Sequence, residues 1–304
     1  MDKAHIYEEL RKLISKENIK RDFPMKYMTS FKIGGPADFI ITPRSMEEVR
    51  KVINFCRQHR VNYFVMGNGT NLLVKDGGFR GIIVKFDDNF DKTEVEGERI
   101  IAESGILLSF LSRIALKEQL SGLEFASGIP GTLGGAIAMN AGAYGYEMKD
   151  VVEWVELMDE KGPVFKLSNE EMGFGYRKSI VQEKNLIVLK ACMKLKKGDY
   201  TEIKNLMDEL NERRRSKQPL FMPSAGSVFK RPEGHYAGKL IEEAGLKGYR
   251  IGDAQVSEMH SGFIVNLGKA SAKDVLLLIE HIRNVVKEKF GIWLEPEIKI
   301  IGED

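Results

Sequence analysis

The sequence predicts an α+β protein in which helices and strands are divided among more than one region. Three observations carry this prediction. The first 75 residues alternate helix and strand patterns, the middle of the chain is rich in strand patterns, and the part beyond residue 200 combines amphipathic helices with short apolar strands. A chain of 304 residues has room for two or more domains. We therefore divide it into residues 1–75, 76–200 and 201–304.

The first region is expected to be a compact β-α-β unit that follows an N-terminal helix. Apolar residues recur at helical spacing in residues 2–16. A second helix is expected to begin at Ser45, between strands at residues 39–41 and 63–66. The resulting unit covers roughly residues 34–75.

The middle region is expected to be antiparallel in character. Strand patterns at residues 151–158 and 164–167 flank the turn sequence Asp159-Glu160-Lys161-Gly162, which is typical of a hairpin. A helix is expected at residues 107–116, with Leu107, Leu111 and Ile114 facing inward.

The last region is expected to form a separate α/β domain. A helix begins near Thr201 and places Leu206 on its apolar face. A capping box at Ser271 and Asp274 begins a long amphipathic helix. A strand at residues 297–301 closes the chain. Its alternation places Glu297 and Lys299 on the same face, where an exposed ion pair is the alternative to a functional role for Glu297.

Composition excludes several classes of protein. Hydrophobic residues make up 43% and charged residues 30% of the chain, as in globular proteins that are soluble. A net charge of +2 with interspersed signs argues against nucleic-acid binding. No apolar run suggests a signal peptide or membrane insertion. The two distant cysteines, Cys56 and Cys192, suit the cytoplasm, and the scattered histidines predict no metal site. No obligate protein partner is evident.

A glycine-rich run at residues 128–145 is the most informative segment. It holds six glycines, four alanines and no charge, together with apolar residues that a surface linker would lack. Such density indicates that the backbone approaches something closely. Exposed N–H groups that lead into a helix start could bind phosphate oxygens. Tight helix–strand packing without a ligand is the alternative.

A second loop, Gly67-Asn68-Gly69-Thr70-Asn71, follows an apolar strand pattern and could offer N–H groups, a hydroxyl and amides to a diphosphate. The apolar residues 72–74 follow directly, so a plain β-hairpin turn is the alternative. Two such loops favour a nucleotide cofactor, although neither has the Rossmann or P-loop pattern.

Three side chains stand out as candidates for chemistry. Ser227 follows a glycine beside an apolar strand, where its hydroxyl could line a pocket or merely lie at a strand edge. Arg177 lies beside aromatic residues and could clamp a carboxylate, or could be a solvated surface arginine. Glu297 is the third candidate. No G-x-S-x-G pattern surrounds the serine, which disfavours a hydrolase.

These segments together resemble the UDP-N-acetylenolpyruvoylglucosamine reductase (MurB) family of peptidoglycan synthesis. The resemblance covers nearly the whole chain, in the family's order, and is closest to the shorter, type II form. The matching stretches are FKIGGPADFIITP, GNGTNLLV, GLEFASGIPGTLGGAIAMNAGAYG, GYRKS, AGSVFKRP, AGKLIEEAGLKG, HSGFIVN and WLEPEIKIIG.

The resemblance implies a two-part FAD-binding region of the vanillyl-alcohol-oxidase (PCMH) type, followed by a C-terminal α/β substrate-binding domain. FAD would be held without a covalent bond, because neither glycine loop contains the His or Cys that such a bond needs. NADPH would reduce the flavin and then leave. The residues that the resemblance assigns to the cofactor are Gly67, Asn68, Gly69, Thr70, Asn71, Gly128, Ile129, Pro130, Gly131, Thr132, Gly134, Gly135 and Ala136.

The resemblance also implies the reaction, in which UDP-N-acetylglucosamine enolpyruvate is reduced to UDP-N-acetylmuramate. Arg177 would stabilise the developing negative charge, Glu297 would help to orient the carboxylate, and Ser227 would donate a proton. The residues that it places at the substrate are Tyr176, Arg214, Lys217 and Arg231. Two other functions stay open at this point: an FAD-dependent oxidase for another alcohol or sugar, and a nucleotide-sugar sensor that only keeps the fold.

Overall fold

The computed structural model describes residues 2–304, which form two compact units. The first unit contains the described residues up to Arg21 together with Phe39–Asn68 and Gly81–Arg214. The second unit contains Asp22–Asp38, Gly69–Arg80 and Arg215–Asp304. The division into three functional domains at residues 75 and 200 stays a prediction, because compactness alone does not test which part binds which ligand.

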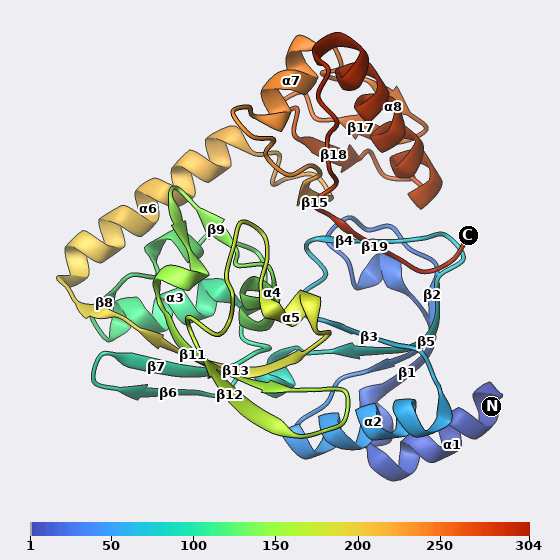
Figure 1. Cartoon of the computed structure of the whole chain (residues 1–304), viewed down its shortest axis with the longest axis vertical. Helices are drawn as coiled ribbons and strands as arrows, with labels where there is room; N and C mark the ends of the chain where they lie inside the picture. The colour runs from blue at the N-terminus through green and yellow to red at the C-terminus, as the bar shows by residue number, and fades with distance from the viewer. Residues whose placement is uncertain (1) are drawn as a thin grey trace. The chain divides into compact units, whose positions relative to one another are not determined.

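An antiparallel sheet of five strands is the largest element of the first unit. Its order is β12-β11-β13-β7-β6 (Figure 1). The expected hairpin is confirmed, with Val155 of β11 opposite Leu167 of β12. The strands are β6 (Thr93–Glu96), β7 (Arg99–Glu103), β11 (Val152–Met158), β12 (Val164–Ser168) and β13 (Ile187–Lys194).

A second sheet has the order β1-β2-β5-β3, so that β5 inserts between the two strands of the expected β-α-β unit. Helices α1 and α2 lie side by side next to its strands (Figure 1). Helix α1 ends before residue 16, because Ile14 adopts an extended backbone with φ −136°. The elements are α1 (Lys3–Leu13), β1 (Ile19–Pro24), β2 (Pro36–Ile41), α2 (Met46–His59), β3 (Tyr63–Met66) and β5 (Phe79–Lys85).

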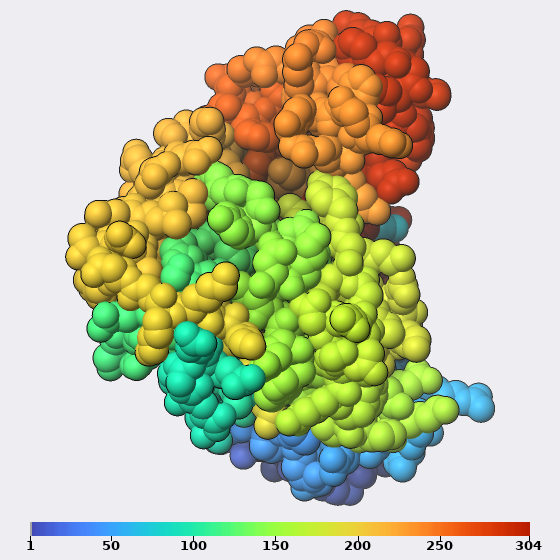
Figure 2. Space-filling model, turned by 60° about the vertical axis from the view of Figure 1, so that its left-hand side comes forward, coloured from blue at the N-terminus to red at the C-terminus, as the bar shows by residue number. Residues whose placement is uncertain are grey.

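Apolar packing joins the N-terminal helices to the large sheet of the same unit. Leu10 of α1 and Ile53 of α2 share one buried cluster with Met158 of β11 and Leu189 of β13. In Figure 2 the blue N-terminal residues accordingly adjoin the green and yellow-green residues of this unit. Burial of these side chains removes apolar surface from water, which is the main stabilising contribution to such a unit.

The shorter elements of the first unit surround the glycine-rich run. Helix α3 begins one residue later than expected, so it buries Leu108, Leu111 and Ala115, while Leu107 and Ile114 are only partly buried. The elements are α3 (Leu108–Lys117), β8 (Leu120–Ser121), α4 (Leu133–Ala138), β9 (Gly142–Ala143), β10 (Tyr146–Glu147), α5 (Ile180–Glu183) and β14 (Lys196–Lys197).

Helix α6 (Tyr200–Lys217) carries the chain from the first unit into the second. It buries Ile203, Met207 and Leu210. Leu206, which was expected on the buried face, is 42% exposed. The buried residues are spaced by four and three, which leaves Leu206 at the edge of the apolar stripe.

The second unit packs α7 and α8 against a sheet in the order β15-β18-β17-β16 (Figure 1). The expected capping box is confirmed: Ser271 and Asp274 each accept a hydrogen bond from the other's backbone N–H. The elements are β15 (Ser224–Ser227), α7 (Ala237–Glu243), β16 (Arg250–Ile251), β17 (Ala254–Val256), β18 (Phe263–Asn266) and α8 (Ala272–Phe290).

Strand β4 (Leu72–Val74) pairs with the C-terminal strand β19 (Lys299–Ile301) in parallel (Figure 1). The hairpin alternative for the loop before β4 is therefore wrong, because β4 does not return along β3. The closing strand also begins later than residue 297. The backbone N–H of Glu297 donates instead to Val228 O at 2.7 Å, which holds this residue against the segment that follows β15.

Candidate active site

The two glycine loops that the sequence singled out meet in the first unit. A Cβ atom on Gly67 would lie 2.0 Å from Thr132 Oγ1, so only glycine fits there. The Asn68 side chain donates from Nδ2 to Pro130 O at 3.0 Å. The side-chain amide that could have bound a phosphate thus joins the two loops instead. Phosphate binding in this part of the loop would fall to backbone N–H groups.

The start of α4 is less open to a phosphate than the sequence suggested. The N–H groups of Leu133 and Gly134 donate to Ile106 O and Ser104 O, both at 2.9 Å. Gly134 also packs tightly, since a Cβ there would lie 2.8 Å from Ser104 Cβ. Gly135 differs, because it is exposed and an added Cβ would approach only Thr132 Oγ1, at 3.6 Å. Gly134 therefore serves protein packing, whereas Gly135 leaves room for a ligand.

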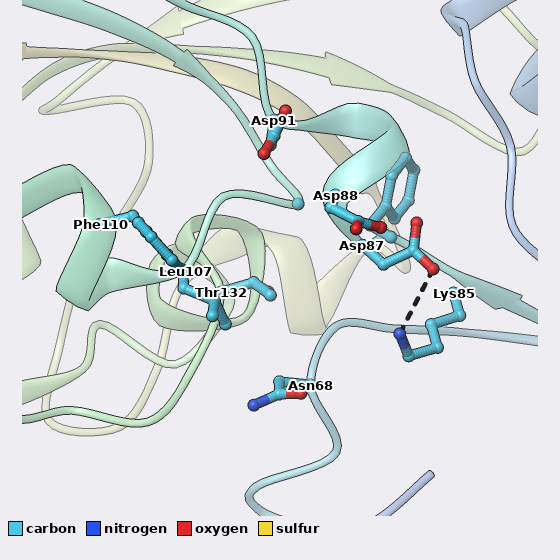
Figure 3. A pocket seen from close by; sticks show the side chains of 10 residues that line it. Asn68, Lys85, Asp87, Asp88, Asp91, Leu107, Phe110 and Thr132 are labelled. Carbon is cyan, nitrogen blue, oxygen red and sulfur yellow. Dashed lines mark hydrogen bonds and ion pairs between the residues drawn. The ribbon is translucent and has the colours of Figure 1, made fainter.

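A cavity of about 420 Å³ adjoins these loops within the first unit. Figure 3 shows Leu107 and Thr132 on one side, Lys85 and Asp87 on the other, and Asn68 at the end of the cavity. Its volume falls in the range of pockets for small molecules and cofactors. The residues that line it are Asn68, Lys85, Phe86, Asp87, Asp88, Asp91, Gly105, Leu107, Phe110 and Thr132.

Charge around this cavity is mainly acidic, since Lys85 Nζ lies 3.4 Å from Asp87 Oδ2 and two further aspartates line the wall. Carboxylates repel phosphate and accept hydrogen bonds from hydroxyl and amino groups. The aspartates therefore suit the sugar or base part of a nucleotide. Among residues 2–304, no group of three or more His, Cys, Asp or Glu side chains is arranged to hold a metal ion.

Two buried hydroxyls beside the loops lack a hydrogen-bond partner within the described chain, namely Ser104 Oγ and Thr132 Oγ1. A buried polar atom without a partner costs about 1–3 kcal/mol. Thr132 lines the cavity, so a ligand that supplies an acceptor there would offset this cost. Together with the cradle at Gly67 and the open side of Gly135, this arrangement fits a dinucleotide cofactor.

Arg214 lies against the start of the glycine-rich run. Its Cδ would be 3.1 Å from a Cβ on Gly128, and its Nε is buried without a partner among residues 2–304. Burial lowers the pKa of the Arg214 guanidinium because the charged form loses hydration, and a nearby anion would offset that cost. The family resemblance places Arg214 at the substrate, whereas in the structure it packs against the loop expected to hold the cofactor.

Arg177 belongs to the same unit and occupies a tight turn after β12. Gly175 and Lys178 exchange backbone hydrogen bonds of 3.0 and 3.2 Å across this turn. The guanidinium carbon of Arg177 lies 5.2 Å from the centre of the half-exposed Tyr176 ring. Arg177 itself is partly buried, so it is neither the buried clamp nor the solvated surface arginine that the sequence left open.

Ser227 and Glu297 lie together in the second unit. Ser227 is partly buried opposite Phe263, and Val228, its neighbour, accepts the Glu297 N–H at 2.7 Å. The Glu297 carbonyl in turn accepts from Asn71 Nδ2 at 3.1 Å. The structure thus brings the backbone next to Ser227, the backbone of Glu297 and the end of the first glycine loop together, although these segments lie far apart in the sequence.

The remaining expected substrate residues lie at the surface of the second unit. Lys217 is exposed at the end of α6, and Arg231 stacks over the Tyr236 ring with 4.0 Å between guanidinium carbon and ring centre. Sequence reasoning missed Asn140 and Ser30 as structural residues of the site. The Ser30 hydroxyl donates to Ser224 O at 2.6 Å, and its backbone N–H donates to Gly69 O at 3.2 Å.

Two family models match successive parts of this chain. A family model described as FAD binding domain matches residues 37–168. A second, described as UDP-N-acetylenolpyruvoylglucosamine reductase, C-terminal domain, matches residues 218–301. The fold and the loop site therefore define an FAD-dependent oxidoreductase with a flavin-binding region of the vanillyl-alcohol-oxidase (PCMH) type and a second, C-terminal domain.

Full-length relatives narrow the assignment. The chain is 58% identical over 298 residues to the UDP-N-acetylenolpyruvoylglucosamine reductase of Caldanaerobacter subterraneus subsp. tengcongensis, covering 98% of each chain. It is 54% identical over 304 residues to that of Clostridioides difficile, covering 100% of each. The crystal structure of MurB from Thermus caldophilus matches with a TM-score of 0.79 at 39% identity, covering 93% of this chain and 97% of the other. The chain belongs to the UDP-N-acetylenolpyruvoylglucosamine reductase (MurB) family.

Substitution of Gly67 by alanine should weaken FAD binding by about tenfold or more, because the new Cβ would force apart the two loops. The dissociation constant can be measured by titrating apoprotein with FAD and following flavin fluorescence. Gly135→Ala, at the open side of the second loop, is a control for folding alone. It should keep the melting temperature of the apoprotein, since the added Cβ meets the chain only at ordinary contact distance. Wild-type affinity in Gly67→Ala would show that the loops do not hold the cofactor.

Within residues 2–304, no helix is both long enough and apolar enough to cross a lipid bilayer.

Proposed function

We propose that this protein reduces the enolpyruvyl group of UDP-N-acetylglucosamine enolpyruvate to the lactyl ether of UDP-N-acetylmuramate, with NADPH as the reductant. One observation carries the assignment of residues. The backbone N–H of Glu297 donates to the carbonyl of Val228, the residue after Ser227, and the Glu297 carbonyl accepts from the Asn71 side chain of the first glycine loop. This network supports a site that handles a proton beside a nucleotide cofactor.

FAD, when bound, supplies two-electron chemistry, since it accepts a hydride from a nicotinamide and passes one on to the substrate. The protein would hold it without a covalent bond. The loops around Gly67 and Gly128 contain no His or Cys. Cys56 and Cys192 are both buried, and burial raises the pKa of each thiol to about 12. Neither thiol is therefore a thiolate that could attack a flavin.

The substrate double bond takes up a hydride at its terminal carbon and a proton at the carbon that carries the ether oxygen. Negative charge develops at that second carbon and in the attached carboxylate. We propose that the fixed positive charge of Arg177 stabilises it. Glu297 would orient the reacting group. Ser227 would donate the proton from Oγ, which a serine can do only to a strongly basic carbon in a site that excludes water.

Anionic parts of the ligands require basic partners. We propose that Arg214 serves the cofactor, because it packs on Gly128 with a buried Nε that lacks a protein partner among residues 2–304. Lys217 and Arg231 would serve the diphosphate of the nucleotide sugar, with Tyr176 beside the reacting group. Since this sugar is a soluble intermediate of wall synthesis, the enzyme would act in the cytoplasm.

The experiment that tests the proposal is a visible absorbance spectrum of purified protein under anaerobic conditions. NADPH should bleach the flavin bands, and UDP-N-acetylglucosamine enolpyruvate should restore them. A flavin that bleaches but ignores the sugar would overturn the proposed substrate. Rapid reoxidation by air without the sugar would instead indicate an oxidase. A protein that binds the sugar but takes no electrons from NADPH would indicate a sensor.

A further inference from the structure

The turn that carries Arg177 has a backbone conformation that arginine disfavours. Arg177 has a φ of +55°, in the left-handed region that glycine and asparagine occupy more readily. It is the third residue of the β-turn between Gly175 and Lys178, where a positive φ usually selects glycine. The surrounding structure must therefore hold this turn in place. An arginine kept at a strained backbone position indicates a functional role for its side chain.

Asn140 supplies the first restraint. Its side chain is completely buried, at 0% exposure of the residue, at the end of the glycine-rich run. Its Nδ2 donates to Gly175 O and to Glu147 Oε2, both at 3.0 Å, and its Oδ1 accepts the Lys149 N–H at 2.9 Å. The amide thus uses donor and acceptor at once. An aspartate could keep the bond to Lys149, but it would place a carboxylate against the Gly175 carbonyl and the Glu147 carboxylate.

Gln182 supplies the second restraint, from the surface. Its Nε2 donates to Ala138 O, at the end of α4, at 2.8 Å and to the carbonyl of Arg177 itself at 3.4 Å. The buried Ser179 hydroxyl donates to the same Ala138 carbonyl at 2.8 Å. Three side chains therefore fasten the Arg177 turn to residues 138–140, which directly follow the cofactor loop.

We propose that Asn140 and Gln182 are positioning residues for Arg177. They fasten its turn to the end of α4, the helix that follows the cofactor loop. The position of α4 therefore also fixes the position of the Arg177 guanidinium. This inference rests on the proposed function, in which Arg177 stabilises negative charge on the substrate. It assigns no contact with substrate to either residue.

The test measures the two half-reactions separately in the FAD-bound enzyme, by stopped-flow absorbance of the flavin. Gln182→Ala should leave reduction by NADPH at the wild-type rate and slow reoxidation by the enolpyruvyl sugar about tenfold. Asn140→Asp should slow reoxidation more, toward ~10²-fold, since it loses two donors. Lys184→Gln, an exposed change two residues beyond Gln182, is the matched control and should alter neither rate.

The Arg177→Lys background separates positioning from a general structural effect. If Gln182 acts through Arg177, adding Gln182→Ala to Arg177→Lys should slow reoxidation less than about twofold further. Full multiplication of the two effects would overturn the inference. The inference would also be overturned if Arg177→Lys reoxidises slowly but Gln182→Ala reoxidises at the wild-type rate. Gln182 is exposed, so its replacement by alanine does not threaten folding. If Arg177→Lys itself reoxidises normally, the proposed role of Arg177 fails, and this inference falls with it.

Discussion

Replacement of Ser227 by alanine should abolish proton delivery and leave the rest of the enzyme intact. We expect bound flavin that NADPH still reduces, with reoxidation by the enolpyruvyl sugar slowed by about 10²–10⁴-fold, the contribution of a general acid. The structure explains why the effect should be confined to chemistry. Ser227 is only partly buried, and the backbone of the adjacent Val228 is held by hydrogen bonds with Gly262 and Glu297 that an alanine at 227 retains.

Two further variants make this result specific. Ser224→Ala lies on the same strand, and the bond that holds this position uses the Ser224 carbonyl rather than its hydroxyl, so turnover should stay at the wild-type level. Ser227→Cys keeps a donor and should recover part of the lost rate. A solvent deuterium isotope effect on reoxidation should be present in the wild type. Normal reoxidation in Ser227→Ala would remove this serine from the mechanism.

Replacement of Arg177 by lysine should slow reoxidation by about 10²–10³-fold, the usual cost of losing one aligned donor to a developing oxyanion. Lysine keeps the positive charge but lacks the planar fork that engages both oxygens of a carboxylate. Reduction by NADPH should be unaffected, because the charge develops only on the enolpyruvyl group. Stopped-flow measurement of both half-reactions checks this expectation.

Stability and catalysis should separate at this position. Arg177→Gly relieves the left-handed backbone at φ +55°, so its melting temperature should stay close to that of the wild type while reoxidation is lost. Lys178→Ala is the control. Its exposed side chain forms a surface ion pair with Glu183 at 2.6 Å, which contributes little. Retention of fast reoxidation in Arg177→Lys and Arg177→Gly would mean that another cation stabilises the charge.

Much of the fold could be predicted from short stretches of sequence. The β11–β12 hairpin follows from alternating apolar residues around a turn signal, and α8 follows from its capping box and apolar stripe. The predicted helix boundaries and buried faces were less accurate where a shift of one residue changes which side chains are buried, as at Leu107 and Leu206. Local patterns specify periodicity well, but packing partners decide which edge of an apolar stripe is covered.

The candidate site divides in the same way. Glycine spacing could not show that Gly67 and Gly135 have different roles. Gly67 allows the two loops to pack together, whereas Gly135 leaves space for a ligand to approach. The same holds for the N–H groups at the start of α4, which bind Ser104 and Ile106 carbonyls rather than facing a ligand. Glycine density indicates that another group approaches closely, and only the tertiary structure decides which group that is.

The sequence by itself determined the long helices and the β11–β12 hairpin of this protein, its two glycine loops and its family, because propensity, periodicity and motif order are properties of neighbouring residues. Tertiary structure alone decided that β4 pairs with β19, and that the Asn71 amide binds the Glu297 carbonyl 226 residues away. It also decided that buried Asn140 holds the turn of Arg177. Hydrogen bonds between distant segments depend on register and chain path, which a local pattern does not encode.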